Sequence, residues 1–125
     1  MKKYFIFLLL LFSLSVFGQE NPQLSFQKQT IDLGEITIDN KNNIIKVNFI
    51  FYNNGNKPLV IYKVTASCHC TTPTWPKAPF PTNKKGIIEI AFDSKGQKGA
   101  FSKNLFVESN AEKPITLIKI KGIIK

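Results

Sequence analysis

Apolar and polar residues alternate with a period of two along most of the chain, and this pattern predicts β-strands. The segment 44–52 is the clearest case, because every second residue from Ile45 to Phe51 is apolar, whereas Lys46 and Asn48 face the other way. No helical spacing is found after the first 18 residues. Seven segments are predicted as strands: 24–28, 30–36, 44–52, 59–66, 86–93, 101–108 and 115–124.

Turn-forming residues separate these segments at intervals of about ten residues. The stretches 53–58, 94–99 and 109–114 are dense in asparagine, glycine, serine and proline, which favour chain reversal. About seven short strands joined by such turns predict an all-β fold, an antiparallel β-sandwich. A closed barrel is the alternative, because alternation does not distinguish closure of one sheet from stacking of two.

The inward face of the segment 59–66 is ambiguous. Leu59 and Ile61 predict one inward face, whereas Val60, Tyr62 and Val64 predict the other. A β-bulge within this strand would let both sets contribute to the core.

The segment 72–82 is predicted to be a stiff, extended loop. Four prolines punctuate it, and proline cannot donate a backbone hydrogen bond, so we expect few ladder hydrogen bonds here. Trp75 and Phe80 lie in this loop. One interpretation is that their rings cap the open end of the sandwich, and the other is that they form an aromatic anchor for a protein or glycan partner.

Residues 1–18 have the features of a cleavable secretory signal peptide. Lys2 and Lys3 precede an apolar run that begins at Tyr4, and Gly18 supplies a small residue before the predicted cleavage point. The run is shorter than the roughly 20 apolar residues that a membrane-spanning helix needs. We therefore expect an exported protein, periplasmic or extracellular, which is soluble after cleavage and does not span a membrane.

Cleavage would leave 107 of the 125 residues, with 15 basic residues against 8 acidic ones and a net charge of +7. This length suits one domain, predicted over residues 24–125. The lysines mostly alternate with apolar residues, a pattern typical of solvated faces and protected strand edges, and they would also attract anionic envelope polymers. Nucleic acid is not an expected partner, because the chain has no RNA-binding motif and no helix to enter a major groove.

Both cysteines and the only histidine lie within Ser67–Thr71. In extended chain the Cα atoms of Cys68 and Cys70 would be about 6.5–7 Å apart, the outer limit for a disulfide. A bridge therefore needs a local bend, and in an exported protein with two cysteines it is the only intramolecular pairing. So small a loop gains only about 1.5 kcal/mol from chain entropy, too little to be the main support of the fold.

Three interpretations of this cluster are open. The first is a structural pair, bridged or buried, and the second is a labile dithiol with redox chemistry. The third is a soft-metal site formed by Cys68, Cys70 and His69, for which copper(I) suits better than zinc, since structural zinc normally takes four ligands. Chelation by His69 requires a turn. A hydrolytic role is disfavoured because no third group is evident to orient the imidazole.

Five runs of the sequence follow one another in a specific order: 54–61, 67–71, 75–76, 99–103 and 109–111. Together they resemble the exported bacterial family known as domain of unknown function 1573, over residues from about Phe26 to Ile123. The resemblance implies export and an immunoglobulin-like sandwich, similar to Hydin-like and major-sperm-protein-like domains, with no established activity. His69 stands where that family usually has glycine, and residues 81–85 stand where it tends to have Pro-Gly. We expect Asn83 or Gly86 to supply a left-handed turn conformation instead.

These observations predict an exported, non-enzymatic β-sandwich that acts as a binding or assembly module, without a cofactor. Its partner is expected to be a protein or another component of the cell envelope, with Trp75 and Phe80 as candidate contact residues. The alternative function is copper(I) binding or thiol redox chemistry through Cys68, His69 and Cys70.

Overall fold

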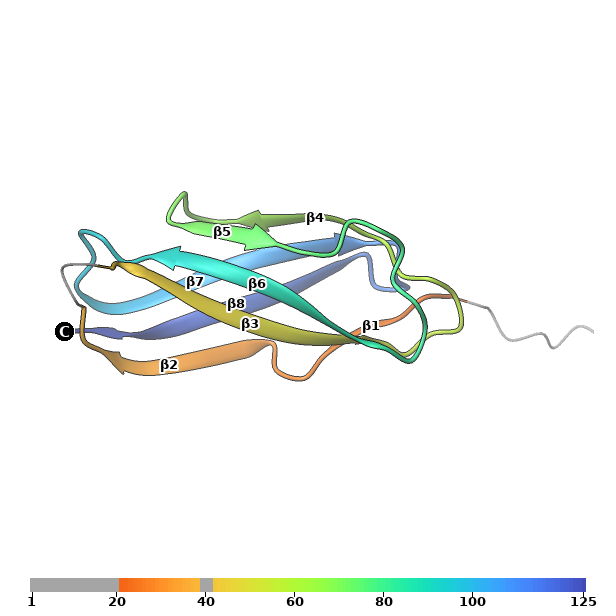
Figure 1. The fold of residues 1–125 in the computed structure, drawn as a ribbon, viewed down its shortest axis with the longest axis horizontal. Coiled ribbons are helices and arrows are strands. Elements are labelled where there is room, and N and C mark those ends of the chain that lie inside the picture. Colours follow the sequence, from red (N-terminus) through yellow and green to blue (C-terminus); the bar gives the residue numbers. More distant parts are fainter. Residues whose placement is uncertain (1–20, 39–41) are drawn as a thin grey trace, which may run out of the picture.

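The computed structural model describes residues 21–38 and 42–125. Two four-stranded sheets pack face to face, with strand orders β1-β3-β6-β5 and β2-β8-β7-β4 (Figure 1). The predicted all-β sandwich is confirmed, whereas the predicted signal peptide, residues 1–18, lies outside the described residues. The strands are β1 (Leu24–Phe26), β2 (Thr30–Ile36), β3 (Ile44–Asn53), β4 (Ile61–Ala66), β5 (Thr71–Thr74), β6 (Lys85–Asp93), β7 (Gly99–Ser109) and β8 (Ile115–Ile124).

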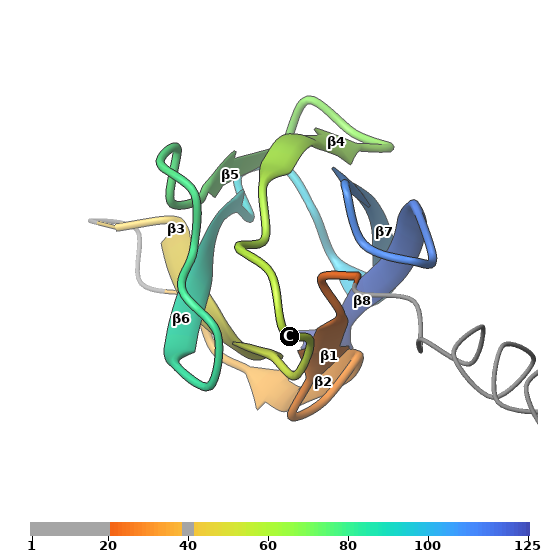
Figure 2. The ribbon, with the colours of Figure 1, turned by 90° about the vertical axis from the view of Figure 1, so that its right-hand side faces the viewer.

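The chain crosses from one sheet to the other on both open sides of the sandwich. β1 and β2 are consecutive in the chain but belong to different sheets, and the same is true of β4 and β5. Figure 2 shows these two crossings on opposite sides of the sandwich. All strand pairs are antiparallel except β2 and β8, which are parallel. Within the described residues, no helix has the length and apolarity needed to cross a membrane.

The core lies between the inner faces of β3, β6, β7 and β8. Phe49, Phe51 and Phe92 are fully buried, and the ring of Phe92 stacks on that of Phe101 at a centroid distance of 4.8 Å. Burial of each such side chain contributes roughly 1.5–3 kcal/mol. The inward residues predicted from alternation are confirmed in β3, β6 and β8, where every second side chain is buried or half-buried.

A bulge resolves the ambiguous face of β4. The register of β4 against β7 shifts between Ile61 and Lys63, so Ile61 and Val64 both point into the core despite their odd spacing. An extra residue in one strand flips the alternation in this way. The expected bulge is therefore confirmed.

The expectation of few ladder hydrogen bonds in 72–82 was wrong for its first residues. β5 pairs with β6 in register, and Pro73 lies opposite Ile90, which raises the strand number to eight. β5 tolerates the proline because it is an edge strand, with one side that needs no ladder hydrogen bond. Farther along, Asn83 takes the expected left-handed conformation, with φ of 60°.

Candidate functional site

The loop between β4 and β5 holds the two cysteines, and their sulfurs are bonded. A turn at residues 68–70 brings the Cα atoms of Cys68 and Cys70 to 5.2 Å, well inside the spacing of an extended chain. The predicted local bend is therefore present, and the bridge joins residues at the point where the chain passes between sheets.

Hydrogen bonds fix this loop independently of the sulfurs. The carbonyl of Cys68 accepts from the backbone N–H and the hydroxyl of Thr71, at 3.3 and 3.1 Å. The N–H of Asp93 in β6 donates to the carbonyl of Cys70 at 2.7 Å. The N–H of Ser67 donates to the backbone carbonyl of Asn104 in β7 at 3.1 Å. Because β6 and β7 belong to different sheets, the loop is attached to both layers of the sandwich.

His69 is exposed at the tip of the loop, beside a shallow depression of about 350 Å³ between β4 and β5. Among residues 21–38 and 42–125, no group of three or more histidine, cysteine and acidic side chains could hold a metal ion. The bonded sulfurs are not thiolates, so ligation by Cys68 and Cys70 would require reduction first. Copper(I) binding and redox chemistry at this loop stay predictions.

Replacing both cysteines with serine is expected to lower the free energy of unfolding by no more than about 1.5 kcal/mol, because the closed loop is short and its hydrogen bonds remain. Urea unfolding of the double variant, compared with oxidised wild type, measures this difference. A variant that fails to fold would make the bridge a main support of the structure. Copper(I) titration of reduced wild type, with the double variant as control, tests the metal prediction.

Trp75 and Phe80 are half-buried and pack against the core. The ring of Phe80 lies 4.9 Å from that of Phe51, and the ammonium of Lys77 lies over the indole of Trp75, 3.0 Å from its centroid. Both rings thus have contacts within the chain on at least one side. A role for them in partner binding stays a prediction.

The buried side chain of Asn53 joins three segments that are distant in sequence. Its amide nitrogen donates to the carbonyls of Lys57 and Phe80 at 2.7 and 3.2 Å. Its amide oxygen accepts from the N–H groups of Gln23 and Gly55 at 3.2 and 3.0 Å. All four hydrogen-bonding positions of the amide are therefore occupied, although the sequence had placed Asn53 only in a turn-forming stretch.

Asn110 makes a second link of the same kind. Its side-chain oxygen accepts from the N–H of Val60 at 2.8 Å, and its nitrogen donates to the carbonyl of Pro58 at 3.3 Å. The N–H of Glu112 donates to Pro22 at 3.2 Å. Residues 21–23, 54–60, 75–84 and 110–114 are thereby tied together at one end of the sandwich, which we name the loop end and which faces the viewer in Figure 2.

Three large apolar side chains gather on the outer face of the sheet β2-β8-β7-β4. Phe106 in β7 lies directly opposite Leu117 in β8, and Ile115 is two residues from Leu117 on the same face. Their exposed fractions are 42%, 42% and 51%. We name these residues the outer apolar cluster. The sequence pattern indicated only that lysines alternate with apolar residues, so the cluster was not recognised from the sequence.

The edges of both sheets carry features that prevent pairing with another strand. β1 has three residues, and β5 has four and contains Pro73. β2 is irregular between Asp32 and Glu35, where Gly34 has a φ of 66°, and β4 combines its bulge with Lys63. A partner is therefore more readily received on a face or at an end than along an edge.

The geometry defines an eight-stranded β-sandwich domain with a bridged crossover loop, a hydrogen-bonded loop end and an outer apolar cluster. The family model "Protein of unknown function (DUF1573)" matches residues 24–124, so the chain belongs to that family. The suspected family is thus confirmed. A comparison with curated proteins finds no match.

Solved structures with similar folds have low sequence identity to this chain. A protein of unknown function from Porphyromonas gingivalis W83 is similar over 87% of this chain and 50% of its own, with a TM-score of 0.70 and 16% identity. The YadV chaperone is similar over 82% and 52%, with a TM-score of 0.60 and 13% identity. The VesB protease of Vibrio cholerae is similar over 82% and 32%, with a TM-score of 0.62 and 15% identity. The chain thus spans about half of the first two proteins and a third of the protease, and the likeness concerns the fold alone.

Proposed function

We propose that this protein is an exported, non-enzymatic binding module that receives a protein partner on the outer apolar cluster. The observation that carries the proposal is the direct pairing of Phe106 and Leu117 on a solvent-facing sheet surface. Such contiguous exposed apolar side chains on a stable domain are typical of interaction surfaces. Aromatic and aliphatic residues of this kind supply the centre of an interface.

The charges around the cluster support a partner surface that is apolar and uncharged at its centre. Of the described lysines on this face, only Lys119, which lies opposite Thr30 and Asn104, has no acidic residue opposite or beside it. The face therefore has little net charge despite the basic composition of the chain. A strongly charged partner would gain little here. The pairs are Lys63 opposite Glu108, Lys121 opposite Asp32, and Lys125 bonded to Glu35 at 2.9 Å.

Two further observations support export and the absence of catalysis. The predicted signal peptide and the bonded pair Cys68–Cys70 suit an oxidising compartment outside the cytoplasm. The only histidine, His69, is exposed at a loop tip rather than oriented in a cleft, which gives little support for a nucleophile and base arrangement.

The proposal is tested by placing a photo-crosslinking amino acid at position 106 in the producing cells, in wild-type and Leu117→Thr backgrounds. Threonine keeps the strand propensity but removes the apolar side chain. We expect one protein to crosslink at position 106 and to be lost in the Leu117→Thr background, while the unfolding curve stays within about 0.5 kcal/mol of wild type. The same amino acid at position 87, on the opposite sheet, is the matched control.

Equal crosslinking at positions 106 and 87 would contradict the proposal, because it would reflect chance contact. Crosslinks to a second copy of this chain would replace the heterologous partner with self-association. Sedimentation of the purified protein provides an independent check, since the proposal expects a monomer.

A further inference from the structure

The loop end carries five exposed lysines, which are Lys57, Lys77, Lys84, Lys113 and, at the start of β6, Lys85. Glu112 is the only acidic residue that the described part of the loop end contains. The ion pairs found among the described residues are Lys46–Glu89 and Lys125–Glu35, and neither lies at this end. The loop end is therefore a concentration of uncompensated positive charge.

The lysines are mounted on a rigid base rather than on free loops. The backbones of Leu59 and Phe80 exchange two hydrogen bonds, at 2.9 and 2.6 Å. The N–H of Asn83 donates to the carbonyl of the buried Asn53 at 2.9 Å, which fixes the residue before Lys84. Because this base is already ordered, binding of a partner would cost little loop entropy.

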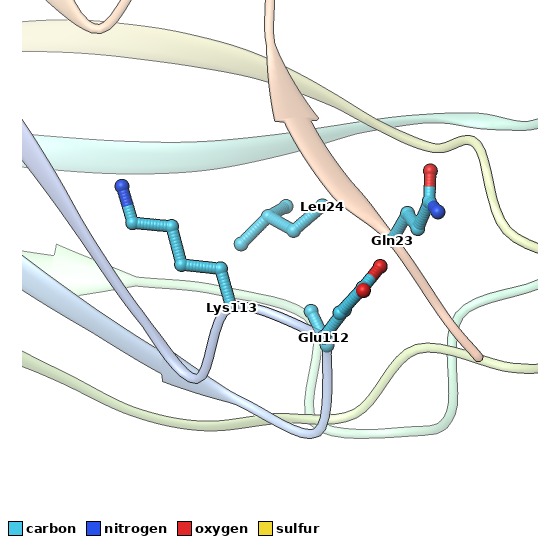
Figure 3. Close-up of a pocket in the computed structure, with 5 residues that line it drawn as sticks. Gln23, Leu24, Glu112 and Lys113 are labelled. Carbon is cyan, nitrogen blue, oxygen red and sulfur yellow. The ribbon is translucent and has the colours of Figure 1, made fainter.

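The arrangement does not resemble a pocket for a small anion. The depression at this end has a volume of about 280 Å³ and is lined by Gln23, Leu24, Ala111, Glu112 and Lys113, so an acid shares it with the lysine. Figure 3 shows the side chains of Glu112 and Lys113 pointing in different directions from the turn. The remaining cations come from two other loops, and they line none of the depressions described within residues 21–38 and 42–125.

From this geometry we propose that the loop end docks on the surface of a membrane rich in anionic phospholipid. Point charges spread over the end of a rigid body match a planar array of lipid phosphates better than one compact ligand. The chain uses only lysine as its cation, and an ammonium attracts phosphate without the bidentate geometry that specific recognition of a single group employs.

The first described residues of the chain also lie at the loop end. The N–H of Asn54 donates to the carbonyl of Gln23 at 3.0 Å, so the chain enters the sandwich at the loop end. The proposed surface is separate from the outer apolar cluster, so a membrane contact and a protein partner do not exclude each other.

The test is flotation of the purified mature protein with vesicles of equal parts phosphatidylglycerol and phosphatidylcholine, and with vesicles of phosphatidylcholine alone. One triple variant removes charge at the loop end: Lys57→Gln, Lys84→Gln and Lys85→Gln. The matched triple variant removes the same charge elsewhere: Lys95→Gln, Lys98→Gln and Lys121→Gln. The substituted side chains make no ion pair among the described residues, so both variants should unfold as wild type does.

We expect wild type to bind only the anionic vesicles, and binding to fall about fivefold for each lysine removed at the loop end, or about a hundredfold for the triple variant. The matched variant should lose only a few-fold. Equal losses in both variants would overturn the proposal, because net charge rather than the loop end would then be responsible. Binding to soluble poly-aspartate without any binding to anionic vesicles would also overturn it, in favour of an acidic polypeptide.

Discussion

Replacing Phe49 with alanine is expected to lower the free energy of unfolding by about 3–5 kcal/mol. The side chain is fully buried in β3, and the ring of Phe26 meets it edge-on at a centroid distance of 6.4 Å. Alanine would remove apolar contact area and leave a cavity between the sheets. Because the free energy of unfolding of a small domain is only about 5–15 kcal/mol, urea denaturation should readily detect this loss.

Phe106→Ala is the matched control for this experiment. It makes the same substitution in a strand of the opposite sheet, but the ring lies on the outer face and is 42% exposed. We expect a loss of about 1 kcal/mol or less, because no internal cavity is formed. If both variants lost the same stability, the assignment of inner and outer faces would be wrong.

Replacing Asn53 with alanine is expected to lower the free energy of unfolding by about 2–4 kcal/mol, a loss unusual for a polar residue next to a turn. The side chain is fully buried, and its removal would leave the carbonyl of Lys57 without the donor described for it and the carbonyl of Phe80 with only the N–H of Leu59. The N–H of Gln23 would also lose its acceptor. Thermal or urea unfolding measures the effect.

Asn54→Ala provides the comparison, since it removes a neighbouring amide that is exposed and bonds only the hydroxyl of Ser25 among the described residues. A change of about 0.5 kcal/mol or less is expected there. Similar small changes in both variants would mean that the loop end is not held through Asn53.

The strands that form the core were predictable because each buries one face only. In β3 and β8 the alternation of Val47 with Asn48, or of Ile118 with Lys119, specifies both the strand and its inward side. β5 was missed because Pro73 argues against a central strand, and only tertiary structure shows that this segment lies at an edge. The strand was short and carried no apolar alternation of its own.

The loop end was beyond sequence reasoning for a different reason. Asn53 bonds groups 30 and 27 residues away, and local propensity describes it only as a turn residue. The glycine at position 55 also depends on a segment distant in sequence, because a Cβ atom there would collide with the backbone of Pro22 and Gln23. Contacts between residues so far apart in the sequence follow from the packing of the sheets rather than from the local sequence pattern.

The cysteine cluster and the outer apolar cluster also differ in how far the sequence could predict them. The sequence located the cluster of Cys68, His69 and Cys70 because rare residue types are visible in any chain, but it left the bond between the sulfurs open. The outer apolar cluster needs the register of β7 against β8, which places Phe106 beside Leu117. That register was not available from alternation, which reports the face of each strand but not its neighbour.

The central claim is that two apolar layers pack face to face and thereby hold a rigid loop end. Native-state amide hydrogen exchange tests it most directly. We expect the inner strands β3, β6, β7 and β8 to be strongly protected, and the amides of Leu59, Phe80 and Asn83 to be protected as well, since each donates a backbone hydrogen bond. Exchange of these three loop-end amides at the rate of an unstructured chain, or an unprotected β3 and β6, would contradict the account.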